Sequence, residues 1–420
     1  MSNKLLTISV ASYNVEEYLD KTLQSLICEP DIMELLEVII VDDGSSVRTS
    51  LIAQNYVSQY PDTFVLIKKQ NGGHGSTLNV AAHQAHGKYF RMLDGDDWYE
   101  TKQLEKFVQG LENTNVDCVI TPYCQIYGDK VIDIDVHNLE NGRNYYLNEI
   151  MDEYARNSFS SEIMAPEFAI KTDILRKYGL CLQEKCMYTD KEYDLFAILY
   201  SRTFMKLPYA VYQYRLGNEG QSVGYSGRKK YLLDTKKVIF SMLQTIDAKK
   251  KYIVNDNHKK CLYHYVLGTI QFFCESILYA SGDLDAEGIL LNFMKELKVV
   301  NKEFTQYFIA NSTYSWWEWL FSLKGKLEHK KCVIFGAGRY GEKILKYLKN
   351  VEIEPEALLD NNKQLWNTER HECVVESPDQ LLSKYSEVQI IIAVKNQPEL
   401  IVNQLLSMGV SEDRIIAFRK

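Results

Sequence analysis

The chain has 420 residues, of which 46% are hydrophobic and 25% are charged, with 8 prolines and a net charge of −8. This composition is typical of folded globular proteins and excludes collagen-like, low-complexity and largely disordered chains. The length predicts about two or three domains rather than one core, and the net negative charge argues against nucleic acid as the main partner.

The nine cysteines are scattered, and no two of them form a Cys-x-x-Cys pair. The sequence therefore favours neither a zinc ribbon nor a thioredoxin-type site. We expect reduced cysteines that serve as small apolar side chains in a cytoplasmic protein. The amino terminus enters a strand pattern directly, and we expect no signal peptide there.

Short apolar runs alternate with amphipathic segments in the first hundred residues. The expected strands are 5–12, 36–43, 64–70 and 88–94, and the expected helices are 15–27, 46–60 and 76–86. Strands rich in valine and isoleucine that alternate with helices predict a mostly parallel sheet with helices on both faces. Segments 117–128 and 168–179 extend this domain, for which we predict the limits 1–227.

We predict a helical subdomain or linker at residues 228–328, because turn signals are few there and lysines mark the polar faces of helices. The most hydrophobic window is 261–280, but it contains His264, Gln271 and Glu275. A buried helix therefore fits this window better than a membrane span.

Trp316, Trp317 and Trp319 lie close together and are followed by several lysines. One interpretation places the three rings in a core or in a seam between domains. The alternative is a peripheral contact between these residues and a membrane surface.

Residues 329–420 predict a small Rossmann-like domain. Segment 330–350 is expected to form a strand, a glycine turn and a helix. Further strands are expected at 351–360 and 389–394 and further helices at 377–386 and 398–409, the first with Ser377 as N-cap.

The glycine turn of this last domain has the spacing of a dinucleotide-binding fingerprint. Gly336, Gly338 and Gly341 lie between a strand and a helix, and Asp360 ends the next strand 19 residues after Gly341. Only half of a full Rossmann domain is present, and no hydride-transfer residue is evident. Bound NAD, a sugar-nucleotide site, a scaffold role and a homo-oligomer contact therefore stay open as alternatives.

Three carboxylates close the expected strand 88–94, in the order Asp94-Gly95-Asp96-Asp97. They repel one another unless a positive group lies among them, and open parallel sheets bind their ligands at strand ends. Carboxylate oxygens suit Mg²⁺ or Mn²⁺, which also bridge to diphosphate oxygens. The alternative is a solvated acidic turn.

Two further polar turns follow neighbouring strands. Asp42 and Asp43 close the strand 36–43, and residues 71–75 (NGGHG) lead from the strand 64–70 into a helix. Glycines allow close backbone approach, and a helix N-terminus favours anionic groups. Because these three strand ends share one edge of the sheet, we predict a nucleoside-diphosphate site with a divalent cation.

Four segments occur in a fixed order: ISVASYN, IIVDDGS, NGGHGSTLN and GKYFRMLDGDDW. This order resembles the family 2 glycosyltransferases of the GT-A fold over residues 5–223. The resemblance implies a mixed, mostly parallel α/β sheet and the inverting transfer of a sugar from a nucleoside-diphosphate sugar with Mg²⁺ or Mn²⁺. It implies a donor site made of Ala11, Ser12 and Tyr13 at the base, Asp42 as acceptor from the base, Asn71 and Gly73, Asp94 at the ribose, Asp96 at the metal, and Asp97 as a residue that orients the loop.

The resemblance also implies a catalytic base at the start of a helix. The matching segment is 187–195, where Asp190 takes the base position and Thr189 stands in place of the family's usual Glu. Inverting transfer needs one carboxylate to remove the acceptor hydroxyl proton. The alternative is that Asp190 caps the helix and that Glu192 is the base.

Leu78 stands where many relatives have Arg, so the cation that faces the diphosphate must come from another residue. The sequence offers Lys69, His74, Arg91 and Arg215 without ranking them. Segment 212–215, followed by Gln221 and Ser222, resembles the family's segment that closes over donor and acceptor. Arg215 is the candidate diphosphate contact, with a structural ion pair as the alternative.

The signature Gln-x-x-Arg-Trp of processive synthases is absent, which favours an enzyme that adds single sugars. We expect a UDP-sugar donor and a glycan, lipid-linked or cell-surface polysaccharide acceptor, used in the cytoplasm or at the inner face of the membrane. The alternatives are a nucleotidyltransferase and a nucleotide-sugar-binding scaffold without turnover.

Overall fold

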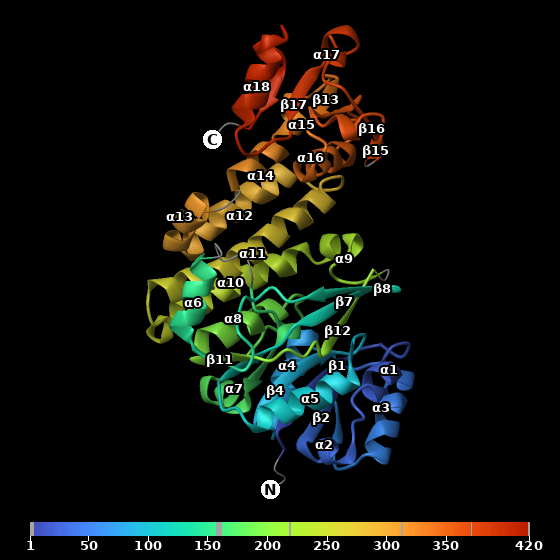
Figure 1. Cartoon of the computed structure of the whole chain (residues 1–420), viewed down its shortest axis with the longest axis vertical. Coiled ribbons are helices and arrows are strands. Elements are labelled where there is room, and N and C mark those ends of the chain that lie inside the picture. Colours follow the sequence, from blue (N-terminus) through green and yellow to red (C-terminus); the bar gives the residue numbers. More distant parts are fainter. Residues whose placement is uncertain (1–3, 157–161, 218–219, 312–313, 371, 419–420) are drawn as a thin grey trace. The chain divides into compact units, whose positions relative to one another are not determined.

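The computed structural model describes residues 4–156, 162–217, 220–311, 314–370 and 372–418. The chain forms two compact units, and helix α11 (Asp256–Ala280) contributes residues to both (Figure 1). The first unit consists of residues 1–227 and 233–270, and the second of residues 228–232 and 271–420. The three domain limits expected from the sequence stay a prediction.

The first unit is built on a mixed sheet with the strand order β3-β2-β1-β4-β10-β6-β11-β9. Its parallel part consists of β1 (Leu6–Ser12), β2 (Leu36–Asp42), β3 (Phe64–Lys68) and β4 (Tyr89–Asp94). The remaining strands are β6 (Cys118–Ile120), β9 (Asn144–Tyr146), β10 (Phe168–Lys171) and β11 (Thr203–Lys206). Strand β10 runs antiparallel to both of its neighbours, which confirms the predicted mixed, mostly parallel sheet.

Buried strands explain why this sheet carries helices. Every residue of β2 is buried, and β1 and β4 each have a single residue that is only partly buried. A strand without an exposed face must be covered on both sides. The helices of the first half of the unit are α1 (Leu19–Gln24), α2 (Pro30–Leu35), α3 (Val47–Gln59), α4 (His74–Gln84) and α5 (Thr101–Glu112).

A smaller sheet lies in the same unit, with the order β5-β12-β7-β8. Its strands are β5 (Trp98–Tyr99), β7 (Tyr123–Tyr127), β8 (Lys130–Ile134) and β12 (Tyr212–Leu216). The segment 117–128 thus contributes β6 to one sheet and β7 to the other, with Pro122 between them. Proline has no N–H for a strand ladder, which fits a break at this position.

The second half of the first unit and the connection to the second unit are mostly helical. The helices are α6 (Leu147–Arg156), α7 (Thr172–Tyr178), α8 (Asp190–Tyr200), α9 (Tyr225–Lys230), α10 (Leu232–Ala248) and α11. Cys261, Leu262, Ile270 and Phe273 of α11 are buried, which confirms a buried helix at 261–280. Within the described residues, we find no helix with the length and apolar character required to cross a membrane.

The second unit combines helices with a six-stranded sheet of order β15-β16-β14-β13-β17-β18. The strands are β13 (Cys332–Phe335), β14 (Leu358–Leu359), β15 (Glu369–Arg370), β16 (Cys373–Glu376), β17 (Gln389–Ile392) and β18 (Ile415–Ala417). All neighbouring pairs are parallel except β15 and β16. The helices are α12 (Ala286–Val300), α13 (Lys302–Asn311), α14 (Tyr314–Phe321), α15 (Leu323–Lys326), α16 (Arg339–Asn350), α17 (Gln380–Ser383) and α18 (Pro398–Ser407).

Two expectations for the second unit are decided by its packing. Trp316, Trp317 and Trp319 are only 2%, 2% and 8% exposed, so the rings belong to the interior of this unit, which was the first of the two alternatives. Ser377 is not the N-cap of α17: the N-cap is Asp379, because the helix begins at Gln380 and the Ser377 hydroxyl instead donates to the Asp379 carboxylate.

Candidate functional site at the carboxyl edge of the parallel strands

The carboxyl ends of β2, β1 and β4 lie side by side. Ala11 near the end of β1 is paired with Val41 on one side and with Asp94 on the other, and Ser12 is paired with Asp42. A Cβ atom on Gly95 would lie 2.6 Å from the Ala11 carbonyl oxygen, so glycine is needed where the loop passes β1. The register therefore places Asp42 and Asp94 on either side of the same strand end, as the sequence analysis required.

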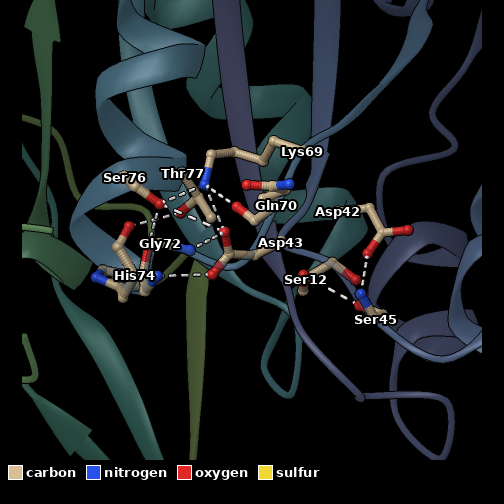
Figure 2. Close-up of polar contacts among 11 residues, drawn as sticks. Ser12, Asp42, Asp43, Ser45, Lys69, Gln70, Gly72, His74, Ser76 and Thr77 are labelled. Carbon is tan, nitrogen blue, oxygen red and sulfur yellow. Dashed lines mark hydrogen bonds and ion pairs between the residues drawn. The ribbon is translucent and has the colours of Figure 1, made fainter. Parts of the chain in front are cut away.

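Asp43 holds the glycine turn that leads into α4. Its Oδ1 accepts from the Gly72 N–H at 2.9 Å and from Lys69 Nζ at 2.7 Å, and its Oδ2 accepts from the Gly73 N–H at 2.8 Å. Figure 2 shows Asp43 facing this turn. The turn amides that the sequence analysis assigned to an anionic ligand are thus bound by a carboxylate of the chain itself.

Asp42 lies on the other side of the β2 end and points away from Asp43, toward Ser45 (Figure 2). Its Oδ1 accepts from the Ser45 N–H at 2.9 Å, and its Oδ2 accepts from the Ser50 hydroxyl. Burial alone would raise the pKa of Asp42, but these hydrogen bonds lower it. Asp42 is therefore an ionised acceptor, and the exposed Tyr13 directly follows Ser12, its partner on β1.

Strand β12 holds the acidic loop in place. The Tyr212 hydroxyl lies 2.7 Å from Asp97 Oδ2 and 3.1 Å from Asp94 Oδ2, and the Arg215 N–H donates to Asp97 Oδ1 at 2.7 Å. Arg215 Nε donates to the Asp96 carbonyl oxygen at 2.8 Å. Asp97 is thus held by β12, which fits the orienting role expected for it, and Tyr212, named in the sequence only as part of the segment 212–215, is a site residue.

The loop carries more negative charge than its own partners neutralise. Burial, with Asp94 adding to it, raises the pKa of Asp96 to about 6, and burial followed by Asp96 raises the pKa of Asp97 well above its usual value. Burial would also raise the pKa of Asp94, but His74 lowers it. Within the described part of the chain, no three His, Cys, Asp or Glu side chains converge as a ready-made metal site.

The structure ranks the four cations proposed to replace the arginine missing at position 78. Lys69 is bound to Asp43 and also donates to the Gln70 carbonyl oxygen at 2.7 Å. Arg91 is fully buried within the first unit. His74 Nε2 lies 3.0 Å from Asp94 Oδ1, and Arg215 contacts the acidic loop directly, so these two cations are the ones placed at the site.

Asp190 and Glu192 differ sharply in their surroundings. Asp190 is the half-buried first residue of α8, and Thr189 occupies the N-cap position, so Asp190 is not the cap. Glu192 accepts from the Gln183 N–H at 3.0 Å, from Gln183 Nε2 at 3.2 Å and from the Ser241 hydroxyl. Both oxygens of Glu192 therefore serve structural contacts, which favours Asp190 as the base; the assignment stays a prediction.

His74 is the common neighbour that brings the predicted residues together. Burial alone would lower its pKa, but the negative charges of Asp94, Asp190 and Asp96 raise it. Asp94 contacts the ring directly, and the charges of Asp190 and Asp96 act on the same ring, although Asp94 and Asp190 are separated by almost a hundred residues.

The segment after β12 connects the acidic loop to the start of α8. Gln221 Nε2 donates to the Arg215 carbonyl oxygen at 2.7 Å, and the Tyr188 hydroxyl donates to the Ser222 carbonyl oxygen at 2.6 Å. Both contacts fit the predicted role of this segment. The Asn71 side chain is exposed at the edge of the glycine turn.

The glycine turn of the second unit has a separate organisation. Gly336 adopts a φ of +115°, and a Cβ on Gly341 would lie 2.0 Å from the Gly336 carbonyl oxygen, so both glycines are required by the turn itself. Apart from its neighbours along the chain, no atom of the described residues lies within 4 Å of a Cβ built on Gly338. Asp360 Oδ2 accepts from the Ala337 N–H at 2.8 Å, which ties the end of β14 to the turn.

Comparisons with known proteins relate two segments of the chain to known families. Residues 7–179 match the family model "Glycosyl transferase family 2", and residues 328–416 match "C2185-like, N-terminal". Over 112 residues the chain is 33% identical to the minor teichoic acid biosynthesis protein GgaB of Bacillus subtilis, a match that covers 26% of this chain and 12% of GgaB. Over 193 residues it is 31% identical to an uncharacterized glycosyltransferase of Rickettsia prowazekii, a match that covers 46% of this chain and 57% of that protein.

The chain thus spans less than two thirds of the length of these relatives. Among solved structures, S. aureus TarS 1–349 in complex with UDP-GlcNAc is similar with a TM-score of 0.53 at 18% identity. That match covers 83% of this chain and 90% of the TarS chain, and it shows a shared fold.

Proposed function

We propose that the chain, whose residues 7–179 match the family 2 glycosyltransferase model, is an inverting, metal-dependent enzyme that transfers single sugars. The donor is a UDP-sugar, and the acceptor is a hydroxyl group of a glycan, a lipid-linked saccharide or a cell-surface polysaccharide. The observation that carries the proposal is the contact of His74 with Asp94 at the carboxyl edge of parallel strands, on a ring whose pKa the charges of Asp190 and Asp96 also raise. This is the edge where open α/β sheets bind nucleotides.

The end of β1 is suited to a nucleoside. Ala11 and Ser12 border Asp42 and Asp94, and the Ser12 hydroxyl is buried without a hydrogen-bond partner among the described residues. A carboxylate offers about four acceptor positions, so Asp42 can accept an N–H of a base such as uracil beside its two serine contacts. TarS, which shares the fold, was solved with UDP-GlcNAc, and we propose the same class of donor here.

The acidic loop is suited to a divalent cation. Its crowded carboxylates have raised pKa values at Asp96 and Asp97, and hard oxygen ligands match Mg²⁺ or Mn²⁺. Such cations are commonly held by one or two carboxylates together with substrate phosphates, so Asp96 would share the cation with the donor diphosphate. When bound, the cation offsets the negative charge of the leaving diphosphate.

The chain's own residues supply the remaining functions. Asp190 accepts the proton of the acceptor hydroxyl as that oxygen attacks the anomeric carbon from the face opposite the diphosphate. Arg215 and His74 place positive charge beside the acidic loop, where charge develops on the leaving group. Tyr212 and the Arg215 backbone keep the loop in position during the transfer.

Substitutions of the two candidate bases, Asp190 and Glu192, test the proposed roles of these residues. We expect Asp190→Asn to lower turnover by about 10²–10⁴-fold while the affinity for UDP with Mn²⁺ stays within about threefold, because Asp190 meets the acceptor. Glu192→Gln should keep most of the activity, since its oxygens serve the Gln183 and Ser241 contacts.

The assay is UDP release from a panel of UDP-sugars with glycan and lipid-linked acceptors, with Mn²⁺ or EDTA, alongside calorimetry with UDP. A fully active Asp190→Asn protein would remove the base assignment. Metal-dependent UDP release from no donor would contradict the proposed function, and UDP binding in that case would point to a scaffold.

A further inference from the structure

His74 connects the acidic loop to the helix that carries Asp190. Its Nε2 lies 3.0 Å from Asp94 Oδ1, and its Nδ1 lies 3.5 Å from Thr189 Oγ1. Asp94 ends β4, His74 begins α4 and Thr189 is the N-cap of α8. One imidazole ring therefore bridges three elements that sequence places far apart.

Close backbone packing keeps this bridge at a set length. A Cβ on Gly75 would lie 2.2 Å from the Gln183 carbonyl oxygen and 3.1 Å from Thr189 Oγ1. The Lys185 N–H also donates to the Gly72 carbonyl oxygen at 2.5 Å. The start of α4 and the segment before α8 are thus in direct contact, with no space for an intervening side chain.

The ring nitrogens have a defined use at this position. The raised pKa of His74 favours the doubly protonated ring, so that one N–H donates to Asp94 and the other is directed at the Thr189 hydroxyl oxygen. The His74 side chain is 22% exposed and Thr189 is fully buried. The contact is therefore shielded from most of the competing water.

We propose that His74 is a positioning residue that couples the two halves of the reaction site. It sets the distance between the Asp94–Asp97 loop, which meets the donor, and Asp190, which meets the acceptor. The identity of the two ligands rests on the proposed function. Without His74 the donor still binds, but Asp190 is no longer held against it, and a misplacement of about 1 Å is enough to lower turnover by about 10²-fold.

A double-mutant cycle tests the coupling. We expect His74→Ala to lower kcat by about 30–100-fold with KM for the UDP-sugar within about threefold. Thr189→Val should lower kcat less than His74→Ala does. The double variant should be no worse than His74→Ala alone, because the two residues act as one unit. Thr189→Ser, which keeps the hydroxyl group, should have the activity of the natural protein. His83→Ala, an exposed histidine of the same helix, is the matched control. Additive losses, or a change in KM alone, would overturn the proposal.

Hydrogen exchange tests the same contact without turnover. The N–H groups of Lys191, Glu192 and Tyr193 donate to the carbonyl oxygens of Tyr188 and Thr189, so their exchange reports on the first turn of α8. We expect His74→Ala, but not His83→Ala, to speed this exchange by about tenfold, which corresponds to a decrease of about 1.4 kcal/mol in the free energy of local opening.

UDP with Mn²⁺ provides the second arm of this experiment. UDP and Mn²⁺ added together should slow the exchange at the start of α8 in the natural protein and leave it unchanged in the His74→Ala protein. Equal exchange in the two proteins would refute the coupling. A natural protein that releases no UDP would instead refute the proposed function, and the exchange measured without ligand would still decide the role of His74.

Discussion

Gly75 tests the geometry of the site most directly, because only the structure shows which atoms a side chain at this position would meet. A Cβ at this position would lie 2.2 Å from the Gln183 carbonyl oxygen, whereas an ordinary C···O contact is about 3.3 Å. The segment before α8 must therefore move by about 1 Å, and it carries Thr189 and the neighbouring Asp190. Overpacking of this kind costs about 1–3 kcal/mol of stability.

We expect the Gly75→Ala protein to remain folded and to lose about 10²-fold in kcat, since a catalytic group misplaced by about 1 Å has an effect of this size. The affinity for UDP with Mn²⁺ should change by less than about threefold, because Asp94 and Asp96 do not lie on the displaced segment. The assay combines UDP release, calorimetry and thermal unfolding.

Gly325→Ala is the matched control for this prediction. Gly325 also lies in a helix, α15, and beyond that helix's own backbone no atom in the described part of the chain comes within 4 Å of a Cβ built there. Its replacement should leave both turnover and stability close to those of the natural protein. If Gly75→Ala has the kcat and the melting temperature of the control, the close approach of α4 to the segment before α8 is not what positions Asp190.

Two further predictions follow from the acidic residues of the site. Asp43→Asn places an amide N–H against the Gly73 N–H and removes the charge that pairs with Lys69, so we expect urea unfolding to show a loss of about 2–4 kcal/mol in the free energy of unfolding. Asp129→Asn in an exposed turn is the control. If Asp43→Asn loses no more stability than this control, the structural role of Asp43 is contradicted. Burial, with Asp94 next, raises the pKa of Asp96 to about 6, so a proton competes with the cation as the pH falls through 6. Calorimetry in the presence of UDP should show Mn²⁺ affinity falling by about tenfold per pH unit below 6 and level above about 7, and an affinity that is constant down to pH 5 would be inconsistent with this competition.

The positions of the acidic residues could be read from local pattern. A Val and Ile run ends at Asp42 and an aromatic and aliphatic strand ends at Asp94, and alternation with helices predicts that these strand ends share one edge of a parallel sheet. Helix α8 could also be anticipated at its first residue, Asp190. Such features depend on neighbours within a few residues, so one sequence is enough to predict them.

The partners of those residues could not be read in the same way. Asp43 binds amides about thirty residues away, and Tyr212 contacts carboxylates more than a hundred residues away. An acidic residue that follows a strand and a later pair of glycines were the available signals for Asp43. The signal for Tyr212 was the resemblance of segment 212–215 to the closing segment of the family, which does not say what its hydroxyl contacts. Which carboxylate faces a ligand and which holds the chain is therefore decided by packing.

The sequence by itself determined the class of fold, the strand ends that carry carboxylates and the helix that begins at Asp190, because hydrophobic periodicity and turn residues act locally. Only the tertiary structure decided that Asp43 serves the glycine turn, that Glu192 is bound to Gln183 and Ser241, that the three tryptophans are buried, and that His74 lies between Asp94 and Thr189. These contacts depend on strand register and on the close approach of segments that are distant in the sequence, and both arise from the packing of the whole unit.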